Sequence, residues 1–403
     1  MKAYERLLNY VRIDTTSDED NSASTPSTDC QHELAKLLEK EMRALGLEDV
    51  YRDEHCYVYG KLPASHGYEA SPTIGLIAHI DTAPDFFGKN VKPRIVENYK
   101  GGDIELGHGR KITVEKFPDL REHIGQNIIV TDGSTLLGAD DKAGIAEILT
   151  ACERLIRENI PHCAVSVCFC PDEEIGHGAE LLDLQRLGAN FAYTLDGDAV
   201  EELSYETFNA CSALWEIQGV NVHPGSAKDI MVNACLVAME INSLLPLDEI
   251  PGKTEGYQGF FHLTDMKGNC EKAELKYIIR DHDAGKFQAR QELMERIEKQ
   301  MKEKYGEGSV KLSITQQYRN MAEVLRDKQD IVLRAERALK KQGLRPDIRP
   351  IRGGTDGSQL SFRGLPCPNL GTGGYGFHGP YEHISTADMD AMVNVVLNLL
   401  GEK

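Results

Sequence analysis

Seven side chains of this chain are carboxylates or imidazoles in positions where metal ions are often bound. Each follows a stretch typical of a buried strand or lies in a glycine-rich turn. Together they could ligate two bridged zinc ions, and a two-metal site with a spare carboxylate is typical of hydrolytic enzymes rather than of structural zinc sites. The seven residues are His79, Asp81, Asp140, Glu173, Glu174, Asp196 and His378.

The segment AHIDTAP places His79 and Asp81 two positions apart at the end of an apolar run. Side chains two apart in an extended chain point to the same side, so Asp81 can accept a hydrogen bond from one ring nitrogen of His79. That bond would fix the tautomer and leave the other nitrogen for a metal. For this pair alone, a capping aspartate beside an ordinary histidine stays open as an alternative.

The segment GADDKAG, residues 138–144, brings Asp140 to the start of a predicted helix. Acidic residues there are commonly caps that interact with the helix dipole, and this alternative stays open for the segment alone. The flanking glycines favour a strained turn, in which a carboxylate could bridge two metals. A phosphate-binding loop is excluded, because the order of residues is wrong and no GK[ST] follows.

Two adjacent glutamates, Glu173 and Glu174, follow an apolar run in PDEEIG. One carboxylate can bind a metal while its neighbour takes a proton from metal-bound water. Acidic runs are more often solvated loops, but the position at a strand end favours a site here. The segment LDGD adds Asp196 at the end of the next predicted strand.

The glycine-rich segment GGYGFHGPYEH, residues 373–383, contains His378, Glu382 and His383. Glycines on either side of His378 allow the backbone to approach metals closely, and His383 is the alternative for the same role. The segment NVHPGSAK, residues 221–228, contains His223, which could be a site residue or an ordinary surface histidine.

The elements around these residues alternate between strands and helices. Residues 73–80, 164–170 and 191–196 are apolar runs of strand length, and residues 143–158 have the spacing of an amphipathic helix. This alternation predicts an α/β domain with a mostly parallel mixed sheet flanked by helices. Ligands of such sheets gather beyond the carboxyl ends of the strands, where His79, Glu173 and Asp196 lie.

From about residue 209 the pattern changes to β-α-β-β-α-β, the order of a ferredoxin-like α+β domain. We therefore expect an inserted domain at 209–317 between two parts of one α/β domain, 1–208 and 318–403. The expected strands are 212–220, 257–264, 274–280 and 309–316, and the expected helices are 178–187, 229–245, 284–305, 328–342 and one from residue 386.

Composition narrows the class of protein. With 403 residues, 45 Lys+Arg and 64 Asp+Glu, the formal net charge of -19 argues against a nucleic-acid partner. No apolar run approaches a membrane span, and the charged first 16 residues do not form a signal peptide. We expect the ten cysteines to be free thiols in a reducing cytoplasm, with Cys168 and Cys170 on one face of a strand.

Eight segments in fixed order resemble the di-zinc aminoacylase/carboxypeptidase G2 superfamily over essentially the whole chain. RGGTDG and TEGYQGF narrow the resemblance to its tripeptide aminopeptidase branch. The segments are HIDTAPD, TLLGADDKAGIAE, PDEEIG, NVHPGSAK, YIIRD, RGGTDGSQLSF, GLPCPNL and FHGPYE.

The resemblance implies two Zn²⁺ per chain, with Co²⁺ or Mn²⁺ as substitutes. His79 and Asp196 would hold one ion, Glu174 and His378 the other, and Asp140 both, through a turn with a cis Asp140–Asp141 peptide. It also implies roles for five further residues: Glu173 as general base, Asp81 as the partner that orients His79, His223 as oxyanion stabiliser, and Arg280 and Arg352 as carboxylate ligands.

The implied activity is release of the N-terminal residue from tripeptides with a free amino terminus, under an inserted domain that acts as a lid. A homodimer through the lid is a further hypothesis from the resemblance. The alternatives are a dipeptidase or an N-acyl-amino-acid deacylase with the same metal ligands, and a metal-bound binding protein without turnover. Retention of Glu173 argues against the last, because binding requires no base.

Overall fold

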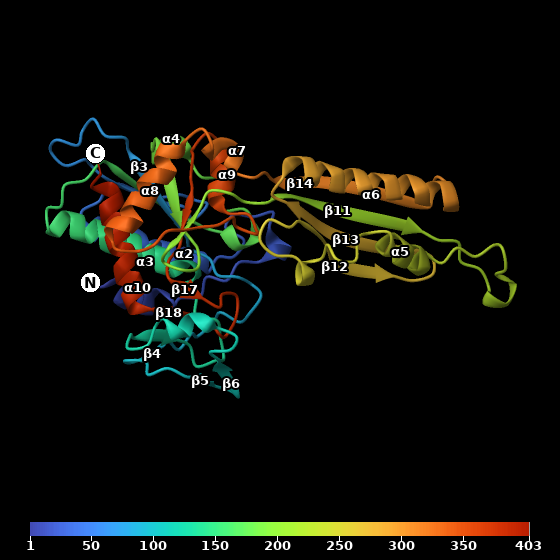
Figure 1. Ribbon diagram of the computed structural model, residues 1–403, viewed down its shortest axis with the longest axis horizontal. Coiled ribbons are helices and arrows are strands. Elements are labelled where there is room, and N and C mark those ends of the chain that lie inside the picture. The colour runs from blue at the N-terminus through green and yellow to red at the C-terminus, as the bar shows by residue number, and fades with distance from the viewer. Residues whose placement is uncertain (403) are drawn as a thin grey trace. The chain divides into compact units, whose positions relative to one another are not determined.

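The computed structural model describes residues 1–402 and divides into two compact units (Figure 1). The large unit comprises Met1–Tyr205, Met321–Arg349 and Thr355–Lys403. The small unit comprises Glu206–Asn320 and the short segment Pro350–Gly354. The insertion was expected at 209–317, and the sequence pattern had not singled out Pro350–Gly354.

The main sheet of the large unit has eight strands in the order β1-β2-β8-β3-β9-β16-β10-β15. The central strands β8, β3, β9 and β16 run parallel, β10 pairs parallel with β15, and the remaining neighbours are antiparallel. The predicted mostly parallel mixed sheet is thus confirmed. Its strands are β1 (Glu48–Arg52), β2 (Val58–Leu62), β3 (Ile74–His79), β8 (Val165–Cys170), β9 (Phe191–Leu195), β10 (Glu202–Ser204), β15 (Asp347–Ile348) and β16 (Asn369–Leu370).

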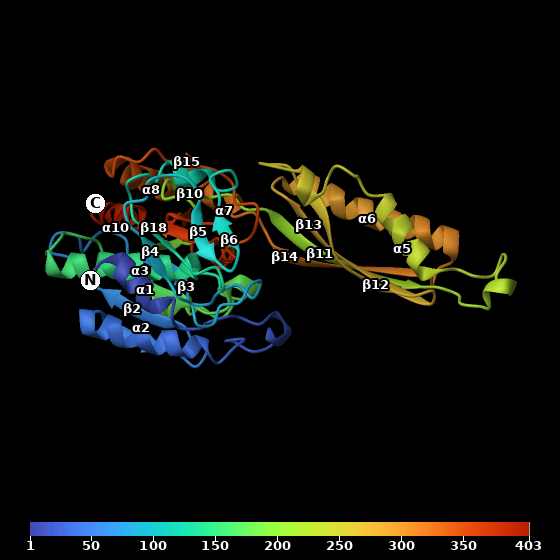
Figure 2. The same cartoon turned by 90° about the horizontal axis from the view of Figure 1, so that it is seen from below.

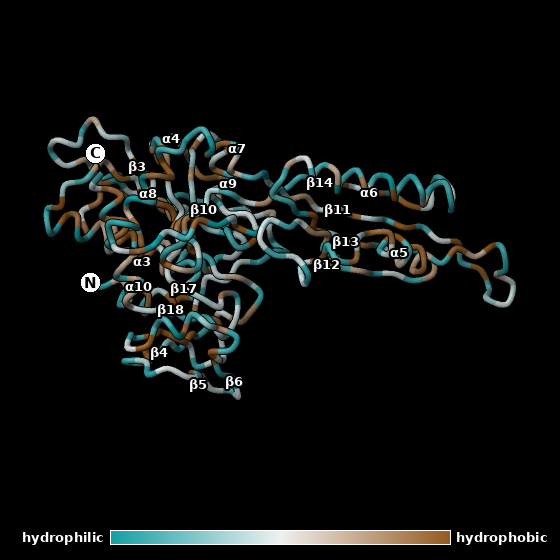
Figure 3. Tube along the Cα trace, viewed as in Figure 1, coloured by the Kyte–Doolittle hydropathy of each residue, from teal (hydrophilic) through white to brown (hydrophobic). Residues whose placement is uncertain are grey.

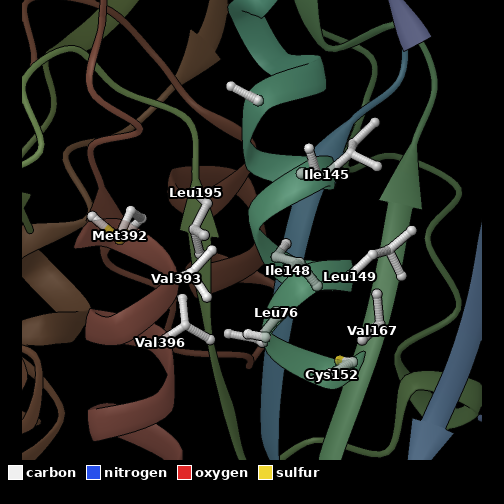
Figure 4. Packing of buried hydrophobic residues seen from close by; sticks show 14 of the residues in the cluster. Leu76, Ile145, Ile148, Leu149, Cys152, Val167, Leu195, Met392, Val393 and Val396 are labelled. Atoms are coloured by element: carbon white, nitrogen blue, oxygen red, sulfur yellow. The ribbon is translucent and has the colours of Figure 1, made fainter. Parts of the chain in front are cut away.

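Helices cover both faces of this sheet. On one face, Ile145, Ile148 and Leu149 of α3 pack with residues of β3, β8 and α10 in the main core (Figure 4). On the other face, Cys168 and Cys170 of β8 share a smaller cluster with residues of α4 and α9, as their two-residue spacing predicted. The helices are α1 (Ala3–Tyr10), α2 (Gln31–Leu45), α3 (Ala139–Arg157), α4 (Leu184–Leu187), α7 (Ala322–Leu325), α8 (Gln329–Lys341), α9 (Asp356–Phe362) and α10 (Thr386–Leu400).

One predicted helix is much shorter than expected. The pattern favoured a helix over 178–187, but only Leu184–Leu187 is helical. Asp183 caps its start by accepting hydrogen bonds from the N–H groups of Gln185 and Arg186, and Gly188 ends it with a φ of 63°. A side-chain cap at one end and a left-handed glycine at the other confine the helix to one turn.

The large unit also contains two small sheets in a region to which the sequence analysis assigned no elements. A four-stranded antiparallel sheet has the order β17-β18-β7-β4, and β5 pairs with β6. All six strands span only two to four residues, too few for a two-residue alternation to stand out. They are β4 (Arg94–Val96), β5 (Ile104–Gly107), β6 (Arg110–Ile112), β7 (Ile128–Val130), β17 (Gly374–Tyr375) and β18 (His383–Ser385).

The small unit has the predicted β-α-β-β-α-β order, with an antiparallel sheet β12-β13-β11-β14. Alternate residues of β11, from Cys211 to Ile217, pack with α5 and α6 on one face (Figure 2). Its elements are β11 (Asn209–Gln218), α5 (Ala234–Ser243), β12 (Phe260–Gly268), β13 (Lys272–Asp281), α6 (Ala284–Tyr305) and β14 (Val310–Tyr318).

The 22-residue helix α6 is predominantly hydrophilic along its length (Figure 3). Its buried positions are confined to one stripe, which is typical of a helix that covers a sheet. Across residues 1–402, no helix combines the length and the apolar character that crossing a membrane requires.

Candidate active site

His79 is the last residue of β3, and its imidazole is held from behind by Asp81. Its Nδ1 lies 3.1 Å from the backbone oxygen of Asp81 and 3.4 Å from the Asp81 carboxylate. A carbonyl oxygen can only accept, so Nδ1 carries the proton and Nε2 presents its lone pair. Nε2 faces Asp140 at 3.0 Å and Asp196 at 3.8 Å. The ring is therefore set in the tautomer that a metal ligand requires.

The Asp81 carboxylate also connects two strand ends. It accepts hydrogen bonds from the backbone N–H groups of Glu173 at 3.0 Å and Glu174 at 3.2 Å. These glutamates begin the short turn Glu173–Ile175, directly after β8. One buried carboxylate thus positions the ends of β3 and β8 relative to each other.

Asp140 lies between the two candidate imidazole ligands. One carboxylate oxygen is 3.0 Å from Nε2 of His79, and the other is 3.4 Å from Nε2 of His378. Its backbone is not helical (φ -80°, ψ 106°), and the Asp140–Asp141 peptide is cis, as the resemblance implied. Its two carboxylate oxygens face the imidazoles of His79 and His378 rather than backbone N–H groups, so the side chain does not act as a helix cap.

Glu382 holds the turn that presents Asp140. Its carboxylate accepts hydrogen bonds from the N–H groups of Leu137, Gly138 and Asp140, at 2.6, 2.7 and 3.0 Å. Burial raises the pKa of Glu382 to about 7, although these bonds favour the charged form. No role was predicted for Glu382, because its partners lie far away along the chain.

Glu173, Glu174 and Asp196 complete the cluster. Oε2 of Glu174 lies 3.0 Å from Nε2 of His378, while its buried Oε1 has no hydrogen-bond partner. Ligand atoms of His79, Asp140 and Glu174 lie within 4.8 Å of one another, as do those of His79, Glu173 and Asp196. Each glutamate thus belongs to a different group of possible ligands that includes His79, and the distinction between ligand and base stays a prediction.

His378 is the most exposed member of the cluster. Its side chain is 45% exposed, its φ is 61°, and its Nδ1 lies 3.3 Å from Asp85. Asp85 was not predicted as a site residue, although it follows Asp81 in the same loop. The alternative histidine, His383, is buried, with Nε2 2.7 Å from Asp119, and its ring packs edge-on against Phe117.

The charges of the cluster fit divalent cations. Burial raises the pKa of Asp196 to about 7 and of Glu174 to about 8, and raises that of Glu173 well above its usual range. Burial also favours a higher pKa for Asp140, but the hydrogen bonds with His378 and His79 outweigh it, and the pKa of Asp140 is lowered. Several buried carboxylates around two imidazoles, with an unpartnered oxygen on Glu174, form the donor set of a dinuclear metal centre.

Three predicted site residues belong to the small unit. His223 caps a short turn, and its Nδ1 accepts a hydrogen bond from the N–H of Gly225 at 3.1 Å. Arg352 donates to the backbone oxygens of Gly256, Gln258 and Thr254. Arg280 donates to the Arg352 oxygen at 3.2 Å, and its buried Nε has no hydrogen-bond partner. The substrate roles of these three residues stay predictions.

Asp356 is a buried acid that the sequence analysis quoted in RGGTDG without assigning it a role. Asp356 is the first residue of α9, and its buried Oδ1 has no hydrogen-bond partner. Burial raises its pKa to about 7, and the charges of His79, Asp196 and Asp81 act on it. It therefore belongs to the electrostatic surroundings of the cluster.

Comparisons with known proteins cover the whole chain. Residues 132–402 match the model of peptidase family M20/M25/M40. Peptidase T of Clostridium perfringens is 52% identical over 400 residues, covering 99% of this chain and 98% of the relative. Two crystal structures have a similar fold: aminopeptidase PepT from Bacillus cereus, with a TM-score of 0.78 and 24% sequence identity, and a tripeptidase from Staphylococcus aureus, with a TM-score of 0.77 and 22% identity. Each match covers 99% of this chain and 97% of the solved chain.

Proposed function

The chain belongs to peptidase family M20/M25/M40, and from this premise we propose that it is a metal-dependent aminopeptidase that releases the N-terminal residue of tripeptides. One observation carries the proposal: the Asp140 carboxylate lies between the imidazoles of His79 and His378, with Glu173 in the same buried cluster. A two-metal centre with an adjacent carboxylate is suited to hydrolysis of an amide bond.

We propose two Zn²⁺ as the native ions, with Co²⁺ or Mn²⁺ as substitutes, because carboxylate and imidazole ligands suit all three. His79 and Asp196 would hold one ion, Glu174 and His378 the other, and Asp140 both. The bound metals would polarise the scissile carbonyl and lower the pKa of water from 15.7 towards ~7.

The protein side chains supply the proton transfers and the positioning. Glu173 takes a proton from the attacking water and returns it to the leaving amine. Asp81 keeps His79 in its ligand tautomer. In the small unit, His223 stabilises the oxyanion, and Arg280 and Arg352 bind the carboxylate of the peptide. Arg280 has an unpartnered Nε available for this, whereas Arg352 already donates to three backbone oxygens.

A panel of peptides tests this function. Zinc-loaded protein is incubated with matched di-, tri- and tetrapeptides and with an N-acetylated tripeptide, and release of the N-terminal residue is followed. Cleavage of the free tripeptide alone, abolished by a chelator, is the expected result. Cleavage of the dipeptide or of the acetylated peptide would instead indicate a dipeptidase or an N-acyl-amino-acid deacylase.

We also propose that the protein forms a homodimer through the small unit. Helix α5 presents Leu236 and Met239 to solvent, at 63% and 60% exposure and three positions apart. Exposed apolar side chains on one helix face are typical of an association surface. Analytical ultracentrifugation should give twice the 44.8 kDa mass of one chain, reduced to one chain mass by Leu236→Glu. A wild-type protein that sediments with the mass of one chain would contradict the homodimer.

A further inference from the structure

A cavity of about 650 Å³ lies in the large unit beside the candidate metal centre. We infer that this cavity, here called the loop cavity, receives the N-terminal residue of the peptide substrate. The inference rests on the proposed function and adds to it where that residue binds and which side chains are preferred there. Two segments, residues 14–30 and 84–89, line the loop cavity, and their lining residues include Asp14, Asp18, Cys30, Asp85, Phe86 and Phe87.

The first wall of the loop cavity comes from residues 14–30, and this segment is attached to Asp172. The N–H and hydroxyl of Ser27 donate to the Asp172 carboxylate at 2.7 and 2.6 Å, and Asp172 precedes Glu173 in the chain. Nearer its start, the wall is joined to the loop after β3, because the N–H of Ser17 donates to the Thr82 oxygen at 3.2 Å. The segment that supplies this wall is therefore anchored at the residue that precedes the proposed general base in the chain.

The second wall, residues 84–89, touches a candidate metal ligand. Asp85 lies 3.3 Å from Nδ1 of His378, so one carboxylate both lines the cavity and supports the metal centre. The N–H of Leu136 donates to the Phe87 oxygen at 3.1 Å, and the Arg110 guanidinium packs 5.4 Å from the Phe86 ring centre. Both sides of the cavity are thus fixed to elements that adjoin the cluster.

The position of the cavity suits the residue that an aminopeptidase releases. The bond to be cut lies between the first and second residues, so the first residue extends only about 3.5 Å of backbone, plus its side chain, from the reacting carbonyl. The cavity wall contacts Nδ1 of His378, whereas Nε2 of the same ring faces Asp140 and Glu174, so the cavity adjoins the cluster across the His378 imidazole. Its volume is also within the usual range for ligand pockets, about 300–1,000 Å³.

The lining of the loop cavity combines acidic and apolar side chains. Asp14, Asp18 and Asp85 provide three carboxylates, and Lys89 is the one basic residue among the lining residues, 3.4 Å from Asp14. This excess of negative charge complements the α-ammonium group of a free N-terminus. Phe87, 57% exposed, supplies an aromatic surface for a side chain. The cavity should therefore favour long apolar or cationic first residues over acidic ones.

Tripeptides of the form X-Gly-Gly, with X as Gly, Leu, Lys or Glu, test the inference. For the zinc-loaded wild type we expect kcat/KM to be higher for Lys and Leu than for Gly, and lowest for Glu. Phe87→Ala should lower the Leu-to-Gly ratio of kcat/KM about tenfold, because it removes apolar contact with the side chain. Asp18→Asn should lower the Lys-to-Glu ratio at least about fivefold while keeping the cap that Asp18 provides to Asp20.

Two further variants make the result decisive. Ile124→Ala removes an equally exposed apolar side chain of the large unit (58%) and should leave every ratio unchanged. Cys30→Phe narrows the cavity from the first wall, and it should lower both the Leu-to-Gly and the Lys-to-Gly ratios of kcat/KM. Wild-type ratios in both Phe87→Ala and Asp18→Asn would overturn the inference and leave the aminopeptidase proposal standing. No release from any peptide by the wild type would instead overturn the proposed function, and the inference with it.

Discussion

At the scale of single residues, each imidazole of the cluster is supported by an acid behind its metal-facing nitrogen. His79 has Asp81 at its Nδ1, and His378 has Asp85 at its Nδ1. Partners of this kind fix the ring orientation and raise the basicity of the ligand nitrogen. The two histidines are equivalent in this respect although Asp81 is fully buried and Asp85 is largely exposed.

Asp85→Asn tests this support. We expect zinc affinity at the site to fall about 10- to 100-fold, because His378 loses the charge that orients and polarises it. Competition with a chromophoric chelator measures the change. Asp49→Asn, which alters another exposed aspartate of the large unit paired with Lys61, is the matched control. Equal chelator midpoints for wild type and Asp85→Asn would show that Asp85 does not act through His378.

Residue types and local spacing predicted the cluster members but not their supporting residues. His79 and Asp81 are two positions apart, so an extended chain is enough to place them together. Glu382 and Asp140 are 242 positions apart, and only the fold brings the Glu382 carboxylate to the Asp140 turn. The substrate role of Arg352 stays a prediction, and its hydrogen bond to the Gly256 oxygen is another contact that only the fold reveals.

At the scale of elements, the contact between α3 and β9 leaves no room for a side chain at Gly144. A Cβ there would lie 2.2 Å from the Leu195 oxygen and 2.5 Å from Oδ1 of Asp141. Asp141 in turn accepts a hydrogen bond from the His79 N–H at 3.1 Å. The close approach of this helix to this strand thus helps to position a candidate ligand.

Gly144→Ala should lower the free energy of unfolding by about 1–3 kcal/mol, because the added methyl group overpacks the interface. It should also weaken zinc binding, since Asp141 must shift relative to His79. Urea unfolding of the apoprotein and a zinc titration measure the two effects. Gly252→Ala, where nothing lies within 4 Å of the new Cβ, is the control. Unchanged stability and affinity in Gly144→Ala would contradict the account of this contact.

A second contact, between the segment after Pro118–Arg121 and α10, predicts a pH dependence. Nε2 of His123 lies 2.7 Å from the Asp388 carboxylate, and both side chains are mostly buried. Burial lowers the pKa of His123, but the hydrogen bond and charge of Asp388 outweigh it, so the net pKa is raised. Because the folded-state pKa is raised, the contribution to stability is complete below the unfolded pKa of about 6.5 and is lost as pH rises through the folded value.

His123→Gln should therefore destabilise the protein by about 1–2 kcal/mol near pH ~5.5 and by less near pH ~9. Urea unfolding at the two pH values measures the difference. His66→Gln, at a fully exposed histidine 3.4 Å from Glu69, serves as the control. A destabilisation that is equal at both pH values would show that the charge of His123 contributes nothing.

Long elements were predictable and short ones were not. The run that became β3 is buried at all six positions, and that continuous burial is what its apolar sequence predicted. Strands β17 and β18, with two and three residues, carry no periodic pattern, and tertiary contacts determine them. The helix expected at 178–187 was wrong in length, because the cap at Asp183 outweighs the apolar spacing before it.

At the scale of the whole molecule, the periodicity of the chain predicted a mostly parallel α/β sheet and a ferredoxin-like α+β sheet, and both sheets are present. The change near residue 209 marks the ferredoxin-like sheet, while Pro350–Gly354 joins the small unit through contacts alone, such as the hydrogen bond from Ile351 N–H to the Glu206 oxygen at 2.8 Å. The relatives confirm the resemblance carried by the motifs over the full chain. All ten cysteines are free thiols, as predicted, and a cytoplasmic location stays a prediction.

The measurement that tests the central claim most directly compares wild type and Glu173→Gln, both loaded with zinc, for metal content and for release of the N-terminal residue from one tripeptide. A dinuclear centre served by a separate base predicts two zinc ions per chain in both proteins and a fall in turnover of about 10²- to 10⁴-fold in the variant. Turnover close to wild type in Glu173→Gln, or loss of zinc from it, would contradict the assignment of Glu173 as base rather than ligand.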